Sequence, residues 1–240
     1  LARLCSVPGD PEAPDLPSDP AELEGLLEKA VSAGLAVEQG AGRWRYSHDL
    51  VRGQLRQVCR QLPNWPALNE MAAELKLAKS EQDPTGIELE VVARHYAETG
   101  MMSQALRLGR ESVRRLHASG LMGHATSFTR RLLEWDDIGH LLSAEARGEL
   151  CLVASESAEH AGQPDEAESY AQQAVGIAQR NYLFSLAARA ASRLGVLRVR
   201  SDRPDEAETW LTDALRFARK SGDAVARSNA HLSLGHFYQH

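Results

Sequence analysis

The sequence contains the same short segment twice, and the two copies begin 40 residues apart. Both copies read Pro-Asp-Glu-Ala-Glu, and they begin at Pro164 and at Pro204. A fixed period of this length is typical of an elongated array in which each unit buries its apolar face on its neighbour. From about residue 67 onward the apolar residues also follow helical spacing. The chain is therefore expected to form an array of paired helices.

The chemistry of the repeated segment explains its position in such a pair. Gly162 and Asp202 are expected in the turn between two helices. Two residues later, Pro164 and Pro204 occupy the first helical position, where no amide hydrogen is needed. The acidic residues that follow interact favourably with the helix dipole. Small residues are expected where two helices approach closely. The structural repeat positions are thus Gly162, Pro164, Ala167, Ala174, Gly195, Pro204, Ala207, Ala214 and Gly235.

This pattern resembles that of tetratricopeptide repeats. That family carries Leu-Gly, then an aromatic residue three positions after the glycine, and then two alanines. Gly195, Ala207 and Ala214 match this order, whereas Arg198 stands in the place of the aromatic residue. Gly235 continues the series, and Tyr238 follows it by three residues. The resemblance implies an all-α fold, a right-handed solenoid of helical hairpins.

An earlier unit fits the same family pattern. The segment "ARHYAETGMMSQA" covers residues 93–105. Residues 120–125 repeat its turn and alanine, with Ala125 only 20 residues after Ala105, as if successive pairs shared one helix. The resemblance covers roughly residues 88–240. The period near 40 is longer than the usual 34 of this family, and it is similar to the longer-helix variants found in bacterial signalling proteins.

The N-terminal part follows a different pattern. Residues 6–20 hold five prolines and favour a loop. Asp19-Pro20 signals the start of a helix that ends near Gly34, and residues 35–47 indicate a short hairpin. A second helix is expected from His48. Helix, hairpin and helix in this order predict a winged-helix-like segment.

The segment "RWRYSHDLVRGQL", from Arg43 to Leu55, resembles the end of the winged-helix domain in bacterial STAND-type signalling ATPases. Those proteins place helical repeats directly after it and are often fused to a kinase, a cyclase or a LuxR-type DNA-binding domain. The implied domains are a winged-helix-like segment at 1–62, truncated at its start, linker helices at 63–87, and helical repeats at 88–240, truncated within a repeat. The sequence contains no Gly-x-x-x-x-Gly-Lys-Ser/Thr loop for a nucleotide phosphate.

Composition limits the remaining classes of function. The formal net charge of −6 argues against a surface that follows nucleic acid phosphates throughout. The three cysteines, Cys5, Cys59 and Cys151, are too far apart for a metal knuckle and fit a reducing, cytoplasmic setting. No apolar run is long enough to span a bilayer. No cofactor is expected.

Two short clusters invite catalytic or metal interpretations. Ser47-His48-Asp49 contains the residue types of a catalytic triad, but triad members converge from separate parts of a chain. We expect these residues to cap and pack the second helix. His236 and His240 share a helix face, and His231 lies nearby, but no third ligand accompanies them. No catalytic and no metal site is therefore predicted.

DNA binding by the winged-helix-like segment is disfavoured. Residues 41–60 hold five arginines against one acidic residue, Asp49. However, the helix at 20–34, which would enter the groove, carries Glu22, Glu24 and Glu28 against Lys29, and phosphate would repel it. The arginines are free to meet an acidic face within the protein instead.

The inner groove of the array is the expected ligand surface. The resemblance places these residues there: Glu149, Leu152, Glu156, Glu159, Arg189, Ser192, Val196, Arg200, Leu232 and His236. The leading hypothesis is a non-catalytic interaction and sensor scaffold of a cytoplasmic bacterial signalling protein, which binds a protein or peptide. Two alternatives are a small-molecule-sensing domain of a LuxR-type regulator and a DNA-binding winged helix with a dimerising tail. The oligomeric state is left open.

Overall fold

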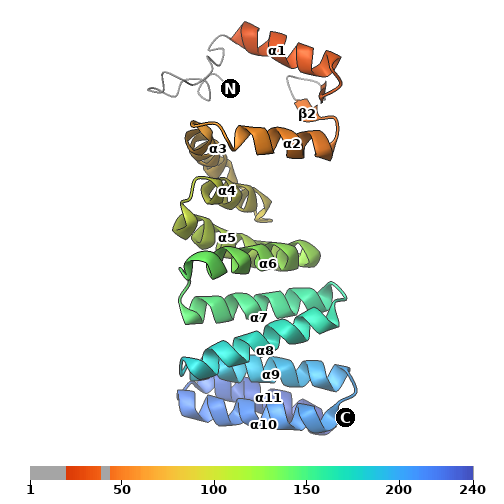
Figure 1. Cartoon of the computed structure of the whole chain (residues 1–240). Helices are drawn as coiled ribbons and strands as arrows, with labels where there is room; N and C mark the ends of the chain where they lie inside the picture. Colours follow the sequence, from red (N-terminus) through yellow and green to blue (C-terminus); the bar gives the residue numbers. More distant parts are fainter. Residues whose placement is uncertain (1–19, 39–43, 240) are drawn as a thin grey trace.

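The computed structural model describes residues 20–38 and 44–239, and most of these residues are helical (Figure 1). The N-terminal part consists of α1 (Pro20–Ser32), β1 (Ala36–Glu38), β2 (Trp44–Tyr46) and α2 (Asp49–Cys59). The helices that follow are stacked one after another in Figure 1: α3 (Trp65–Ser80), α4 (Ile87–Glu98), α5 (Met102–Ala118), α6 (Met122–Gly139), α7 (Ala144–His160), α8 (Pro164–Arg180), α9 (Phe184–Arg200), α10 (Pro204–Ser221) and α11 (Ala224–Gln239). The expected helical array is confirmed.

The two copies of the repeated segment begin two equivalent helices. Pro164 starts α8 and Pro204 starts α10, and each is followed by an aspartate and a glutamate in the first turn. Gly162 and Asp202 lie in the preceding turns with φ of +75° and +54°. The segment therefore marks the point where the chain reverses and a new helix begins.

The turns between helices repeat along the array. Residues with positive φ recur at intervals of about 20 residues, among them Gly100, Gly120, Gly162, Tyr182 and Asp202. In these turns the next amide donates to a carbonyl five residues earlier, for example over 2.8 Å in the turn after α7 and 3.0 Å in the turn after α9. This is the Schellman arrangement, which satisfies the free carbonyl groups at a helix end.

Small residues allow the helices to approach closely. A Cβ atom on Gly195 would lie 2.6 Å from Cγ of Leu211, so only glycine fits where α9 meets α10. Ala207 and Ala214 are fully buried, as are Ala167 and Ala174 in the preceding pair (0% exposed). Close packing of apolar side chains at these positions supplies the main stabilisation of the array.

Alternate helices form one layer of the array. Besides the contacts between consecutive helices, α5 packs on α7, α7 on α9, and α9 on α11. The helix α6 contacts both α5 and α7. It begins after the turn at residues 120–121 and separates α5 from α7 along the chain, as α8 separates α7 from α9.

Arg198 replaces an aromatic contact of the family with a buried ion pair. Its side chain is 7% exposed, and its Nη1 atom lies 2.8 Å from the carboxylate of Glu168 on α8. Its Nε atom lies 3.3 Å from Glu206 on α10. Position 198 therefore still packs between helices, but it does so through an ion pair and not through an aromatic side chain.

The N-terminal hairpin agrees with the sequence. Strands β1 and β2 are antiparallel, with Ala36 opposite Tyr46 and Glu38 opposite Trp44. The connecting residues 39–43 and the expected cap Asp19 lie outside the described residues. The order α1, hairpin, α2 matches the expected winged-helix-like segment, whose assignment stays a prediction.

The capping role expected at the start of α2 is wrong for His48. This residue occupies the N-cap position with φ −140° and ψ 148°, but its side chain makes no capping hydrogen bond. Short side chains with an oxygen acceptor fill that role best, and imidazole is not among them. Ser47 instead donates its hydroxyl to the carbonyl of Gly34 over 2.5 Å, which ties β2 to the end of α1.

Candidate interaction groove

Two adjoining hollows lie against α9. The first, of about 240 Å³, is bounded by α7, α9 and α11, and its lining includes Arg189, Ser192, Arg193, Asn229 and Ser233. The second, of about 430 Å³, is bounded by α9, α10 and α11, and its lining includes Val196, Val199, Leu211, Leu232 and Phe237. The two hollows share Val196 and Ser233. We refer to them together as the α9 groove.

A larger hollow of about 600 Å³ runs along α11. All of its lining residues, such as Arg227, His231 and Gly235, belong to that single helix. A surface formed by one helix has no opposing wall to enclose a ligand. The α9 groove has walls from several helices and is therefore the stronger candidate site.

Most of the residues expected in the inner groove line the α9 groove. The seven are Glu156, Arg189, Ser192, Val196, Arg200, Leu232 and His236. The layer of alternate helices brings them together, because α7, α9 and α11 contact one another in order. Residues 40 apart in sequence thus become neighbours across the layer.

The other three expected residues lie elsewhere. Glu149 lines a separate hollow of about 220 Å³ with Arg110 and Arg114 of α5. Glu159 is 13% exposed and is enclosed by arginines. Leu152 is buried at 4% exposure in the hydrophobic core, so it offers no surface to a partner, contrary to expectation. Burial of this apolar side chain in the core is favourable because it removes the side chain from water.

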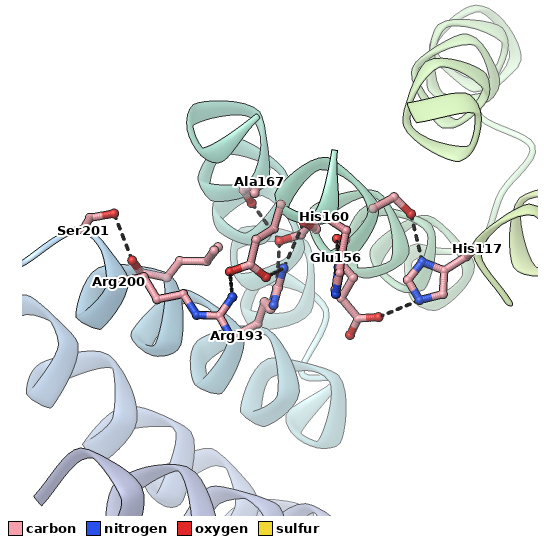
Figure 2. Close-up of polar contacts among 11 residues, drawn as sticks. His117, Glu156, His160, Ala167, Arg193, Arg200 and Ser201 are labelled. Carbon is pink, nitrogen blue, oxygen red and sulfur yellow. Dashed lines mark hydrogen bonds and ion pairs between the residues drawn. The ribbon is translucent and has the colours of Figure 1, made fainter. Parts of the chain in front are cut away.

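Ion pairs connect α7 with α9 along the groove. Arg189 donates to both carboxylate oxygens of Glu149, over 2.5 and 3.0 Å. Further along, a carboxylate oxygen of Glu159 lies 2.6 Å from Nη2 of Arg193 in an ion pair, and Glu159 also pairs with Arg200 (Figure 2). Glu149 and Glu159 of α7 therefore pair with three arginines of α9.

Arg193 was not among the expected groove residues, although it lies one turn after Arg189 on the same helix face. It donates through Nε to the hydroxyl of Ser155 over 3.2 Å and through Nη2 to the Ser155 carbonyl over 3.0 Å. Ser155 in turn donates to the carbonyl of Ala167 on α8 over 2.8 Å (Figure 2). Arg193 therefore joins three helices. The spacing of four residues from Arg189 is the signal that identifies it.

A serine, a histidine and a glutamate meet between α5 and α7. Nδ1 of His117 lies 3.0 Å from the Ser157 hydroxyl, and Nε2 lies 3.5 Å from a carboxylate oxygen of Glu156. This arrangement contains the residue types of a hydrolase triad. However, Ser157 is completely buried, so no substrate can reach its hydroxyl. The contact links α5 with α7 (Figure 2), and Glu156 also lines the α9 groove.

The buried thiol of Cys151 is not placed for chemistry. Burial raises the pKa of the Cys151 thiol to about 11, so it stays protonated and unreactive at neutral pH. Within residues 20–38 and 44–239, no group of three or more His, Cys, Asp or Glu side chains is placed to hold a metal ion. His240, one of the three histidines considered from the sequence, lies outside these residues.

Two arginines at the C-terminal end of α2 pair with an acidic residue of the array. Glu98, at the end of α4, accepts from Arg56 over 2.9 Å and from Nε of Arg60 over 2.8 Å. The indole of Trp65 lies 3.3 Å from the same carboxylate. The hydrogen bond from Arg60 lowers the pKa of Glu98, and the positive charges of both arginines add to this effect against the opposing effect of burial. Two of the five arginines in this segment are thus engaged within the protein.

No helix in the described part of the chain is both long enough and apolar enough to cross a membrane.

Comparison with known proteins identifies the repeats. Residues 154–220, from within α7 to the last turn of α10, match the family model described as tetratricopeptide repeat. These residues contain the two copies of the repeated segment and the Gly195 contact. This stretch of the chain is therefore similar to tetratricopeptide repeats. Among curated proteins, none matches the sequence.

Two solved structures have a similar arrangement of helices. One is BtubC (BKLC) from P. vanneervenii, with 20% sequence identity, a TM-score of 0.46, and coverage of 73% of this chain and 82% of that chain. The other is a Signal Transduction ATPase with Numerous Domains (STAND) protein with a tetratricopeptide repeat sensor from Pyrococcus horikoshii. It has 13% identity, a TM-score of 0.46, and coverage of 89% of this chain and 42% of that chain. The chain thus spans less than half of the length of that ATPase.

Proposed function

We propose that this chain is a non-catalytic interaction scaffold whose α9 groove binds a protein or peptide partner. Tetratricopeptide repeats are typically scaffolds of this kind, and the family match covers α8, α9 and α10. The observation that carries the proposal is the groove itself, which α7, α9, α10 and α11 form together. Its position on the layer of alternate helices gives a partner access to several repeats at once.

The finer proposal concerns the protein to which this chain contributes. We infer a cytoplasmic bacterial signalling protein in which the array senses a partner or packs against an ATPase module. The support comes from the sequence, since "RWRYSHDLVRGQL" resembles the end of a STAND winged helix and directly precedes a helical array. The ion pairs of Glu98 with Arg56 and Arg60 agree with an internal role for α2.

A second candidate function is a receptor for a small molecule. The hollow of about 430 Å³ has a size and an apolar lining that suit a small ligand. DNA binding has less support, because Arg56 and Arg60 are already paired with Glu98 and are not free to meet phosphate.

Site-specific crosslinking tests the leading proposal. A photoreactive amino acid replaces Ser192 in the α9 groove, and a matched variant carries it at the exposed residue Gln172 on α8. In a lysate of the source organism, we expect a discrete protein adduct from Ser192 that is absent from Gln172. Equal adducts from both positions, or none from Ser192, would contradict the scaffold proposal. A melting temperature raised only by metabolites would then favour the receptor.

A further inference from the structure

A second surface lies outside the α9 groove, where α8 turns into α9 and α10 turns into α11. Because consecutive helices run in opposite directions, these two turns lie on the same edge of the array (Figure 1). We refer to residues 180–185 and 219–225 as the turn surface, and none of them lines the α9 groove. We propose that the turn surface binds an acidic segment of a partner protein, with one apolar side chain of that segment against Tyr182. The proposal does not depend on the α9 groove.

Tyr182 has a backbone conformation that disfavours tyrosine. Its φ is +56°, in the left-handed region, where the Cβ atom of an L-residue is crowded. Gly100 and Gly222 occupy the equivalent position, two residues before the first residue of α5 and of α11, and both also have positive φ. Glycine is therefore the residue that the fold alone favours at position 182. Backbone strain of this kind clusters at binding sites.

The tyrosine ring is exposed but held in place. Tyr182 is 78% exposed, and its ring packs edge-to-face on that of Phe184, with 6.4 Å between the ring centroids. Phe184 is partly buried against the core, and Nζ of Lys220 lies 5.7 Å from the centre of its ring. The exposed side chain of Val225 provides further apolar area on the next turn. An aromatic ring that is already ordered loses little conformational freedom when a partner binds.

A hydrogen bond joins the two turns. The hydroxyl of Ser185 donates to a carboxylate oxygen of Asp223 over 2.8 Å. The other oxygen of Asp223 accepts from the backbone amide of Val225, also over 2.8 Å, at the start of α11. The start of α9 and the start of α11 are thus fixed to each other, and the two turns form one surface.

The turn surface is positively charged on an acidic chain. It contains three basic residues, Arg180, Arg219 and Lys220, against one acidic residue, Asp223, whereas the whole chain has a formal charge of −6. The three basic residues are exposed, and none pairs with a carboxylate of the residues that the structure describes. Asp223 is engaged by Ser185 and by α11. Carboxylates of a partner can therefore pair with the basic residues without displacing an existing ion pair.

Selection from a displayed library of random dodecapeptides tests the proposal on the full chain. The library is first depleted on the double variant Arg180→Gln, Arg219→Gln and is then selected on the wild type. The selected peptides are expected to be acidic, with one aromatic or aliphatic residue among the carboxylates, and to bind more weakly as salt increases. They should bind the control Arg107→Gln, Arg131→Gln as tightly as the wild type, since these two arginines are exposed on α5 and α6.

The variant Tyr182→Gly separates binding from folding. It is expected to raise the melting temperature, because glycine relieves the left-handed strain. It should weaken binding of the selected peptides about tenfold, as expected for an aromatic residue at the centre of an interface. Asp202→Gly is the matched control, because Asp202 has a φ of +54° in the turn between α9 and α10, on the opposite edge. This control should raise the melting temperature and leave peptide binding unchanged.

Several results would overturn the proposal. Peptides that are not acidic, acidic peptides that bind Tyr182→Gly as tightly as the wild type, or a failure to enrich any peptide would each do so. A lower melting temperature of Tyr182→Gly with unchanged binding would assign the tyrosine to the fold alone. Binding to vesicles of phosphatidylcholine and phosphatidylserine that the Arg180→Gln, Arg219→Gln variant loses, with no peptide enriched, would identify an anionic membrane as the ligand instead. Crosslinking from Ser192 decides the proposed function separately.

Discussion

At the scale of single residues, the turns before α8 and α10 differ in one informative way. The residue with positive φ is glycine at position 162 and aspartate at position 202. A side chain disfavours this left-handed conformation by about 1–2 kcal/mol, somewhat less for aspartate than for most residues. A Cβ atom on Gly162 would meet nothing within 4 Å, so the backbone alone decides the effect.

Substituting these two residues should therefore change the free energy of unfolding in opposite directions. We expect Asp202→Gly to stabilise the chain by about 0.5 kcal/mol, because relief of strain exceeds the greater freedom of glycine in the unfolded chain. Gly162→Asp should destabilise it by about 1 kcal/mol. Urea denaturation with an unchanged m-value measures both. Shifts of the same sign in the two variants would show that backbone strain does not govern these turns.

Arg198 also acts at the residue scale, through its buried pair with Glu168. Removal of one partner leaves the other charge buried, which typically costs about 3–5 kcal/mol. Arg203 also pairs with Glu168, so we expect Arg198→Ala to lie near the lower end of this range. The double variant Arg198→Met, Glu168→Met should be less destabilised than the sum of the two single Met variants. A double-mutant cycle by urea denaturation measures this coupling, and additive effects would contradict it.

At the scale of elements, one carboxylate connects α2 with the repeats. Glu98 binds Arg56, Arg60 and Trp65, whereas α2 itself makes few other contacts with the array. Glu98→Gln should therefore release α2 while the array stays folded. Hydrogen–deuterium exchange is expected to accelerate in residues 49–60 and to stay unchanged in α8 and α9. Glu134→Gln, at an exposed position of α6, is the control for loss of an acidic residue.

The same contact should respond to acid. The pKa of Glu98 is lowered in the folded chain, so its stabilising effect is complete above the ordinary pKa of glutamate and is lost as the pH falls through the folded value. Protection of α2 should therefore decrease on acidification in the wild type and stay low at all pH values in Glu98→Gln. Equal pH dependence in both chains would exclude Glu98 as the responsible group.

Local chemistry was sufficient to predict many elements from the sequence. Residues close together in the sequence determine where α8 and α10 begin, which small residues lie between helices, and where the hairpin forms. The contact of Arg56 with Glu98 was not predictable in this way, because the two residues are 42 positions apart and meet only when α2 folds against α4. Leu152 illustrates the limit within a helix, since the family spacing places it in the groove and packing buries it.

At the scale of the whole molecule, equivalent positions of successive repeats lie next to one another and form a continuous surface. Positions 40 residues apart on α7, α9 and α11 lie side by side because alternate helices pack on one another. The α9 groove therefore combines Glu156, Ser192 and Ser233 from three helices. The repeated Pro-Asp-Glu-Ala-Glu segments lie outside the residues that line it and provide the spacing of the helices.

The most direct test of the account is hydrogen–deuterium exchange of the full chain, with and without the partner recovered by crosslinking from Ser192. The partner is expected to slow exchange in α9 and in the segments of α7 and α11 that line the α9 groove. Slowed exchange confined to α8 and α10, or to α1 and α2, would contradict it.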